Sequence, residues 1–285
     1  MESVIREASP LTNDDFFLVC HVKNYVADEP LHSHDNYELN LIINANGTRN
    51  IAGSVSPFGP IELVLIGPET PHTWKGEFCN SEIIKVQFHA DFLDKQFLSR
   101  SAALPIKELL QKASKGILFS QLTTENVKDN LLLLAKQQGF DSVLSLYSVL
   151  YDLAISRNMV LLSGFEGEQK RDDEKAWKIS KVEQYVYDNL QRIVKIEEVA
   201  NLLNMSESSF SHFFKKYKRL SFTEYLTSIR VGRAIRLFHE SEESISEISQ
   251  KCGFSNLANF NRAFKNIQLC TPTEYKSKGV NYTFV

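Results

Sequence analysis

Residues 244–275, SISEISQKCGFSNLANFNRAFKNIQLCTPTEY, decide the fold because they repeat a pattern found earlier in the chain. The earlier copy begins with residues 196–217, IEEVANLLNMSESSFSHFFKKY. Ile196 recurs as Ile245, and Phe210 and Phe214 recur as Phe260 and Phe264. An internal repeat of this kind predicts two copies of one structural unit.

Each copy is predicted to be a helix-turn-helix, with a short amphipathic helix, a tight turn and a second amphipathic helix. The two motifs span residues 196–217 and 245–267, and a long helix of about 222–240 joins them. Ser206 and Ser255 are expected to cap the second helices and to leave backbone N–H groups aimed at a phosphate. In a helix-turn-helix the second helix lies in the DNA major groove.

The polar face of each second helix is predicted to bind DNA, because the phenylalanines direct the opposite face inward. The predicted DNA-binding residues are Ser206, Ser208, Ser211, His212, Lys215, Lys216, Asn256, Asn259, Asn261, Arg262 and Lys265. Arg262 can make a bidentate contact to guanine, whereas the corresponding His212 has a smaller reach. We therefore expect the second helix to specify bases more sharply. The first should rely more on phosphates, through Lys215, Lys216 and Lys218.

The charge distribution agrees with a C-terminal part that binds nucleic acid. Residues 171–285 carry 18 Lys and Arg against 14 Asp and Glu, a net charge of +4, whereas residues 1–170 carry 14 against 21, a net charge of −7. The two values make up the net charge of −3 of the whole chain. A local excess of positive charge attracts polyanions. Double-stranded DNA is therefore the predicted partner.

The N-terminal part is predicted to be mostly β. Short β-rich runs between residues 16 and 88 are separated by Asn-Gly, Ser-Pro and Gly-Pro breaks, which favours an antiparallel sandwich or barrel. Two helices, at about 124–137 and 141–157, then close the domain with one broad apolar stripe each. The stripes either pack on their own β-domain or share in a dimer seam.

A charged segment with two glycines divides the chain. Residues 163–174 have little to bury and are predicted to be a linker between domains at 1–162 and 175–285. The predicted fold class is α+β. An antiparallel, cupin-like β-barrel with following helices comes first, and an all-α domain of two helix-turn-helix units joined by a long helix comes second.

The C-terminal motifs resemble the signature of the AraC/XylS family of transcriptional regulators. The resemblance rests on residues 244–275 and on the segments MSESSFSHFFKKY and EYLTSIRVGRAIRLF before them. It implies that the two units read two successive major-groove segments, and that a homodimer acts as an activator with RNA polymerase as a partner. In one respect the sequence departs from the family. The glycine that usually follows each recognition helix is Arg219 in one copy and Leu269 in the other, so both helices are expected to end in a less comfortable C-cap.

The N-terminal part resembles the small cupin-like sensing and dimerisation domain of the same family. His32, His34 and Glu38, with a later His72, follow the order of cupin metal sites, where imidazoles and a carboxylate converge on one cation. The resemblance implies an effector site at His32, His34, Tyr37, Glu38, Arg49, His72 and Trp74. Three roles stay open for the histidines and the carboxylate: binding a divalent transition metal, contacting an organic effector such as a sugar, or hydrogen bonding inside a barrel.

These features predict a ligand-responsive, sequence-specific DNA-binding regulator of transcription and not an enzyme. The alternative is a metal-dependent cupin enzyme with the helical part as an attachment, because imidazole and carboxylate ligands with open positions can support catalysis. Against the enzyme, the sequence holds no separate nucleophile or acid–base constellation.

Length and composition exclude several other classes. A chain of 285 residues favours two domains, and 43% hydrophobic with 24% charged residues is typical of a globular protein. No apolar run approaches the roughly 20 residues of a membrane-spanning helix, and the first ten residues contain no secretion signal. The four cysteines form no CxxC pair, so we expect reduced thiols and a cytoplasmic protein.

Overall fold

The computed structural model describes residues 4–12, 14–24, 30–164, 173–277 and 280–285. The chain forms two compact units. The described residues of the first unit are 4–6, those between 14 and 164, and 280–285; those of the second are 7–12 and 173–277. Most of the predicted linker, 163–174, lies outside the described residues. Each unit is thus assembled from segments that are not consecutive in the sequence.

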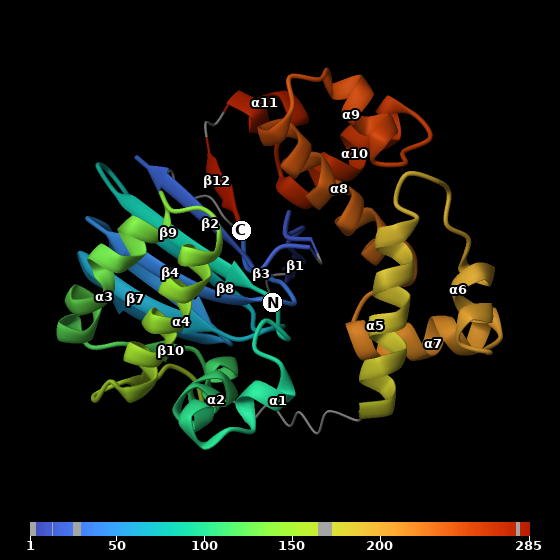
Figure 1. Ribbon diagram of the computed structural model, residues 1–285. Coiled ribbons are helices and arrows are strands. Elements are labelled where there is room, and N and C mark those ends of the chain that lie inside the picture. Colours follow the sequence, from blue (N-terminus) through green and yellow to red (C-terminus); the bar gives the residue numbers. More distant parts are fainter. Residues whose placement is uncertain (1–3, 13, 25–29, 165–172, 278–279) are drawn as a thin grey trace. The chain divides into compact units, whose positions relative to one another are not determined.

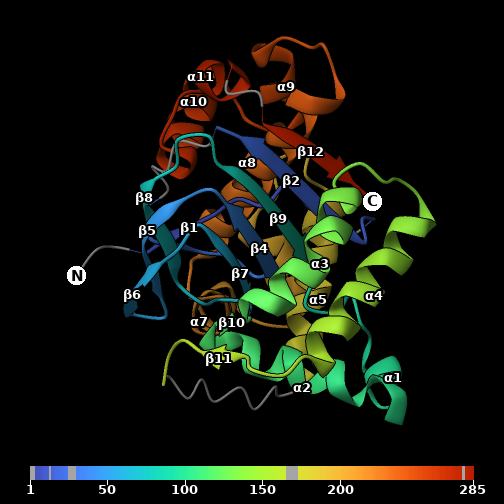
Figure 2. The same cartoon turned by 90° about the vertical axis from the view of Figure 1, so that its left-hand side faces the viewer.

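The first unit holds two β-sheets and a set of helices (Figures 1 and 2). The strands of the five-stranded sheet, in spatial order, are β1 (Ile5–Arg6), β3 (His32–Ser33), β8 (His72–Glu77), β5 (Asn46–Ile51) and β6 (Ser54–Phe58). Those of the seven-stranded sheet are β11 (Val160–Leu161), β10 (Ile117–Leu118), β7 (Ile61–Ile66), β4 (Tyr37–Ile43), β9 (Glu82–Phe88), β2 (Phe17–Lys23) and β12 (Asn281–Phe284). The strands therefore make two sheets and not one closed barrel. The β1–β3 pair is parallel, and the other strand pairs of the described residues are antiparallel.

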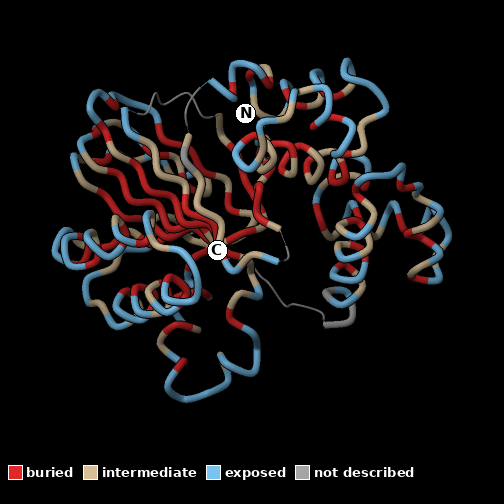
Figure 3. Tube along the Cα trace, turned by 45° about the horizontal axis from the view of Figure 1, so that its top comes forward, coloured by how far each residue is buried: buried red, intermediate tan, exposed pale blue. Residues whose placement is uncertain are grey.

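One face of the seven-stranded sheet is covered by helices (Figure 2). The helices of this unit are α1 (Lys95–Leu98), α2 (Leu104–Lys112), α3 (Gln121–Leu134) and α4 (Phe140–Ile155). Alternate strand residues such as Leu39 and Leu41 pack with Val127, Leu131 and other apolar residues of these helices in one buried cluster. The predicted apolar stripes of both helices therefore pack on their own β-domain. The central strands are buried along their length, as Figure 3 shows.

The opposite face of the same sheet is unusually polar. Because successive strand side chains point to opposite faces, Glu38 and Asn40 of β4 lie on the face away from Leu39 and Leu41. The strand register places Glu38 opposite Gln87 and Asn40 opposite Lys85. All four of these polar side chains are buried. Polar side chains are costly to bury unless they have hydrogen-bond partners, so this face is the candidate functional face of the sheet.

The second unit is all-α. Its helices are α5 (Asp173–Asp188), α6 (Ile196–Leu202), α7 (Glu207–Lys218), α8 (Phe222–Glu240), α9 (Ile245–Lys251), α10 (Leu257–Gln268) and α11 (Pro272–Ser277). Helices α6 and α7 form the first predicted helix-turn-helix, and α9 and α10 form the second. Phe210 and Phe214 of α7, and Phe260 and Phe264 of α10, are fully buried. The predicted α+β class, with a sheet-rich first part and a helical second part, is confirmed.

The N-terminal segment 7–12 is part of the helical unit. Leu11 is buried, and the Thr12 hydroxyl accepts a hydrogen bond from Arg236 of α8 at 3.1 Å. Gly232 of α8 lies so close to this segment that a Cβ atom there would be 2.2 Å from the carbonyl oxygen of Ser9. A glycine is therefore needed at this point of α8.

The last strand, β12, was not expected from the sequence. It follows the helical unit in the chain but pairs antiparallel with β2 in the first unit, with Asn281 opposite His21 and Phe284 opposite Leu18. Val285 continues the pairing, since its N–H donates to the carbonyl oxygen of Phe17 at 3.1 Å. None of the helices among the described residues is both long and apolar enough to cross a membrane.

Candidate functional site

The first recognition helix, α7, begins as predicted. Ser206 is its N-cap, and the Ser206 hydroxyl accepts a hydrogen bond from the backbone N–H of Ser209 at 3.2 Å. The helix ends at Arg219, whose φ of 64° lies in the left-handed region. A left-handed non-glycine C-cap is strained, which confirms the expectation drawn from the missing glycine.

The second recognition helix, α10, begins one residue later than predicted. Asn256 and not Ser255 is the N-cap, and its side-chain oxygen accepts from the backbone N–H of Asn259 at 2.8 Å. Ser255 instead accepts a hydrogen bond from the side chain of Asn259 at 3.1 Å. This helix also ends in a left-handed residue, Leu269, with φ of 58°.

Both helices expose a polar face. The exposed members of the predicted DNA-binding set are Ser206, Ser208, Ser211, His212, Lys215, Lys216, Asn256, Asn261, Arg262 and Lys265, and Asn259 is half-buried. Arg262 is held in place by Asn259, whose side-chain oxygen accepts from the guanidinium at 3.2 Å. The Arg262 guanidinium is therefore oriented without being neutralised.

Lys218 does not belong to this exposed face. It is 8% exposed, forms an ion pair with Glu183 of α5 at 2.5 Å, and lies over the ring of Tyr225. The expectation that Lys218 contacts phosphate is therefore wrong. A lysine stem packs well against an aromatic ring while its ammonium meets a carboxylate. The positive charge of Lys218 is therefore paired within the helical unit.

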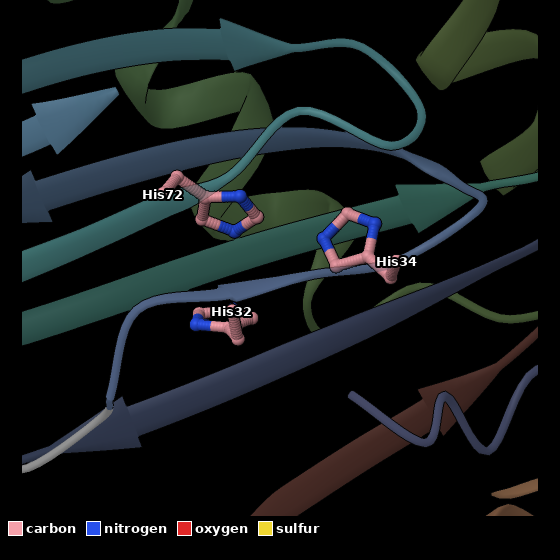
Figure 4. A group of neighbouring side chains, drawn as sticks. All are labelled: His32, His34 and His72. Atoms are coloured by element: carbon pink, nitrogen blue, oxygen red, sulfur yellow. The ribbon is translucent and has the colours of Figure 1, made fainter. Parts of the chain in front are cut away.

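In the first unit the three predicted histidines converge. His32 and His72 come from neighbouring strands β3 and β8, and His34 follows β3 directly (Figure 4). All three are buried. One ring nitrogen from each lies within 4.8 Å of the others, and the rings of His32 and His72 are 4.2 Å apart between centroids. The sequence pattern therefore brings these side chains to one point.

Backbone carbonyl groups orient all three rings. The Nδ1 atoms of His32, His34 and His72 lie 3.0, 3.0 and 2.8 Å from the carbonyl oxygens of Pro30, Asn36 and Thr70. A carbonyl oxygen can only accept, so each Nδ1 carries a proton and each ring directs its Nε2 into the site, where that nitrogen can bind a cation once it carries no proton. The Nε2 atom of His72 is buried with no hydrogen-bond partner among the described residues.

Glu38 lies at the same point, fully buried. Its carboxylate is 3.2 Å from Nε2 of His34 and 3.7 Å from Nε2 of His72, and it accepts a hydrogen bond from Gln87 at 3.0 Å. Burial alone would raise the pKa of Glu38. The hydrogen bond with His34 and the positive charge of Lys85 outweigh it and hold the pKa well below its usual value. The site therefore contains a buried carboxylate anion.

Burial also lowers the pKa of His72 well below its usual value, and the neighbouring His32 lowers it further. A neutral imidazole is the form that binds a metal ion. Three ring nitrogens and one carboxylate, fixed by a second layer of hydrogen bonds, fit a first-row transition ion such as Zn²⁺, Fe²⁺ or Ni²⁺. The chemistry of the donor set therefore suits such an ion.

Arg49 and Trp74 lie in the same interior, joined through Glu62. Arg49 pairs with Glu62, and the indole N–H of Trp74 donates to the same carboxylate at 3.1 Å. Burial raises the pKa of Glu62, while the Trp74 hydrogen bond and Arg49 oppose that rise. The ring of Trp74 meets His72 edge to face, with the centroids 5.8 Å apart. Trp74 therefore adjoins the histidine cluster, and Arg49 is linked to Trp74 through Glu62.

Tyr37 does not join the cluster. It stacks on Phe88, with ring centroids 5.2 Å apart, and packs with the apolar cluster under the helices. Tyr37 precedes Glu38 in β4, so the two side chains point to opposite faces of the sheet. Its inclusion in the effector site was wrong for that reason.

Sequence reasoning missed several polar residues of this interior. Asn40, Glu62, Lys85 and Gln87 are all buried. Asn40 and Gln87 both hydrogen bond to Glu38, and Asn40 is the more distant, at 3.4 Å. These residues could have been found from the sequence by the alternation of polar and apolar residues along each strand. Glu38 with Asn40, and Lys85 with Gln87, place polar residues on one face of strands that are otherwise apolar.

Comparison with known proteins agrees on both parts of the chain. Residues 199–278 match a family model described as a helix-turn-helix domain. The chain is 22% identical over 284 residues to the HTH-type transcriptional activator RhaR of Mannheimia succiniciproducens, a match that covers 96% of this chain and 94% of RhaR. The Msm operon regulatory protein of Streptococcus mutans is 29% identical over 111 residues, 39% of this chain and 40% of that protein.

Solved structures agree on the fold of the whole chain. A crystal structure of an apo variant of ToxT from Vibrio cholerae matches with a TM-score of 0.65 at 15% identity and covers 94% of this chain and 99% of ToxT. Wild-type ToxT bound to an unsaturated fatty acid matches with a TM-score of 0.60 at 17% identity, and the match covers 93% of this chain and 96% of ToxT. These likenesses show the same succession of a sheet-rich part and a helical part.

Proposed function

Because the chain belongs to the AraC/XylS family of transcriptional regulators, we propose that it activates transcription from the cytoplasm, in response to an effector bound by its β-domain. It is a DNA-binding regulator of transcription. The observation that carries the proposal is the pair of helix-turn-helix units, each of which presents an exposed polar helix face. Activation requires contact with RNA polymerase as a further partner.

The two recognition helices divide the reading of DNA. Arg262 on α10 is exposed and oriented by Asn259, which suits a bidentate contact to guanine in the major groove. On α7, His212, Lys215 and Lys216 are exposed, and the two lysines suit phosphate contacts that position the protein without reading bases.

Binding selection by the full chain on randomised DNA tests the function. We expect enrichment of two short sequence blocks one helical turn apart, about 10 base pairs, with affinity that falls steeply as salt rises. Retention of DNA without any sequence preference would contradict sequence-specific regulation.

The effector site lies on the buried polar face of the seven-stranded sheet and on the strands opposite it. Asn40, Lys85 and Gln87 on one sheet, with Arg49 and Trp74 on the other, are groups that hydrogen bond to or stack on a small polar molecule. A sugar has the hydroxyl groups that such residues recognise, so we place it first among effector classes.

We further propose that His32, His34, His72 and Glu38 hold one divalent transition ion. Its chemistry there would be that of a Lewis acid, able to bind an oxygen atom of the effector. The support is the common orientation of the rings and the buried anion beside them. The alternative function, a metal-dependent cupin enzyme, has no support among the relatives named above, which are regulators.

Metal analysis of the purified full chain tests this site. We expect about one equivalent of a first-row ion, with loss of at least tenfold in affinity in His34→Ala. His21→Ala is the matched control, because His21 of β2 pairs with Glu82 of β9, outside the cluster. Equal metal content in the wild type, in His34→Ala and in His21→Ala would exclude the site.

A homodimer forms through α4 in this proposal. The helix buries one stripe against its own sheet and keeps a second stripe exposed. The exposed stripe consists of Phe140 (65% exposed), Leu144 (54%), Tyr151 (44%) and Ile155 (53%). These residues recur at the spacing of a two-helix seam, and a second copy of the same helix is the partner that such a self-complementary stripe fits.

A further inference from the structure

The two helix-turn-helix units meet at a second place besides their connecting helix. The turn between α9 and α10 contains Gly253, with φ of 77°. A Cβ atom at Gly253 would lie 2.2 Å from the carbonyl oxygen of Leu190, which belongs to the loop between α5 and α6. The turn of the second unit therefore rests directly on a loop of the first, with no room for a side chain.

Arg230, in the middle of α8, holds this junction. Its Nη2 atom donates to the carbonyl oxygen of Arg192 in the same loop at 2.7 Å. Its guanidinium lies 5.9 Å from the ring centroid of Phe254, and its Nη2 and Nε atoms would be 3.0 and 3.1 Å from a Cβ atom at Gly253. One side chain thus contacts the loop of the first unit and the turn of the second.

The loop that receives Arg230 is itself held by side-chain contacts. The Arg192 side chain forms an ion pair with Glu198 of α6 at 2.7 Å and donates to Tyr185 of α5 at 2.9 Å. It also donates to the side chain of Asn189 at 2.9 Å. The carbonyl group that accepts from Arg230 is therefore fixed to the first unit by side chains of two helices.

We propose that Arg230 is a positioning residue that sets the distance and angle between the two recognition helices. This inference rests on the proposed reading of DNA by both helices. Two major-groove segments lie at a fixed separation of roughly 34 Å for one helical turn, so a protein that reads both needs its helices held at a matching separation. A planar guanidinium can donate several hydrogen bonds in its plane while its flat face stacks on a ring, whereas a lysine ammonium has no flat face.

The direct test is the distance between the recognition helices in the free full chain. Spin labels are attached at Ser208→Cys and Asn261→Cys, both exposed positions, in a chain carrying Cys20→Ser and Cys79→Ser. Pulsed electron paramagnetic resonance should give one narrow distance distribution. Arg230→Ala should at least double its width, and Arg230→Lys should give an intermediate width. An unchanged width in Arg230→Ala overturns the proposal whether or not the chain binds DNA.

Two further variants distinguish a positioning role of Arg230 from a general effect on the stability of the helical unit. Phe254→Leu removes the ring under the guanidinium without changing any charge, and it should also broaden the distribution. Arg236→Ala is the matched control, because Arg236 lies on the same helix but contacts Glu240, at 2.7 Å, and the Thr12 hydroxyl, at 3.1 Å. Equal broadening in Arg236→Ala would show a general loosening of α8 and overturn the role of Arg230.

DNA binding gives a second readout on a site found by selection. Inserting one base pair between the two blocks should weaken the wild type at least tenfold and Arg230→Ala only two- to threefold. The salt dependence of binding should not change, because Arg230 contacts protein and not phosphate. A salt slope lowered by about one unit in Arg230→Ala would show a phosphate contact and overturn the proposal. Absence of any selected site would count against the proposed function alone.

Discussion

The guanidinium of Arg262 is oriented by Asn259, which suits the base contact that we propose for it. Arg262→Ala should lose discrimination at one guanine worth about 1–3 kcal/mol. The measurement is base preference by binding selection, compared between the variant and the wild type. Unchanged preference at every position would rule out direct reading by this side chain.

Lys216 provides the matched control on the other recognition helix. It is exposed on α7, and Lys216→Ala should weaken binding to all sequences alike and reduce the salt slope by about one unit. A loss confined to particular sequences would instead make Lys216 a reader of bases.

Glu198 links the pH dependence of stability to the start of α6. Hydrogen bonds from Arg192, from the backbone N–H of Lys195 and from Tyr185 lower its pKa to about 2. In the unfolded chain the carboxyl titrates near its usual value of 4.5, so the unfolded state binds the proton first as pH falls. The stabilisation is complete above about pH 4.5 and is lost as pH falls toward 2.

Glu198→Gln should therefore lower the melting temperature of the full chain more at pH 6 than at pH 3. Glu197→Gln, an exposed neighbour in the same first turn, is the control and should show no such difference. Thermal melts followed by circular dichroism at the two pH values measure both. A parallel shift of the Glu198→Gln melting temperature at pH 3 and pH 6 would contradict the assignment.

At the scale of the element, α4 carries two apolar stripes. One is buried with Leu146 and Leu150 in the core under the sheet, and the other is exposed. Leu144→Arg should convert the dimer to a monomer at tens of micromolar, because an arginine in the centre of a helix seam is buried without a partner. Sedimentation of the full chain is the measurement. Leu104→Arg on α2 is the control, because Leu104 is also exposed but lies outside the stripe. A wild type that sediments as a monomer would refute the seam.

The elements that the sequence predicted well are those with strong local patterns. The long helix was placed at about 222–240, and α8 spans Phe222–Glu240. Its start is signalled locally by Ser221 and Glu224, which form a capping box. The N-cap of α10 was displaced by one residue because Ser255 and Asn256 are both good capping residues, and only the backbone conformation chooses between them.

The elements and roles that escaped prediction depend on partners far away in the sequence. Strands β1 and β3 have two residues each, too few to show any period, and they exist because they pair with each other. Lys218 differs from Lys215 and Lys216 in lying four residues after Phe214, on the buried face of α7, and its partner there, Glu183 of α5, is distant in sequence. The convergence of the histidines was predictable because their order resembles a known arrangement.

At the scale of the whole molecule, each unit includes a short segment that the other unit separates, in sequence, from the rest of it. Residues 7–12 belong to the helical unit and β12 belongs to the β-unit. We expect a protease to cut first within residues 163–174, as the composition of that segment predicts. The two pieces should nevertheless elute together from a sizing column in native buffer and separate only in denaturant.

A variant of β12 tests whether this strand keeps the two pieces together. Replacing residues 281–284 by a Gly-Ser sequence removes the apolar and aromatic side chains of β12, and Gly is a poor strand former, so the nicked pieces should come apart more readily. Lys276→Ala, just before the strand, is the control. Pieces that separate at once in native buffer, with the wild-type tail intact, would show that the exchanged segments do not hold the chain together.

Strand β12 also bears on how the protein is made. On a ribosome, β2 and β9 emerge early, but the strand that covers the free edge of β2 is synthesised only after both helix-turn-helix units. At about 5–20 residues per second this leaves the edge of β2 open for roughly 10–40 s. An open strand edge is a template for pairing with other chains, so the newborn β-domain is open to such pairing during that interval. Faster completion of the chain should therefore raise the yield of native protein.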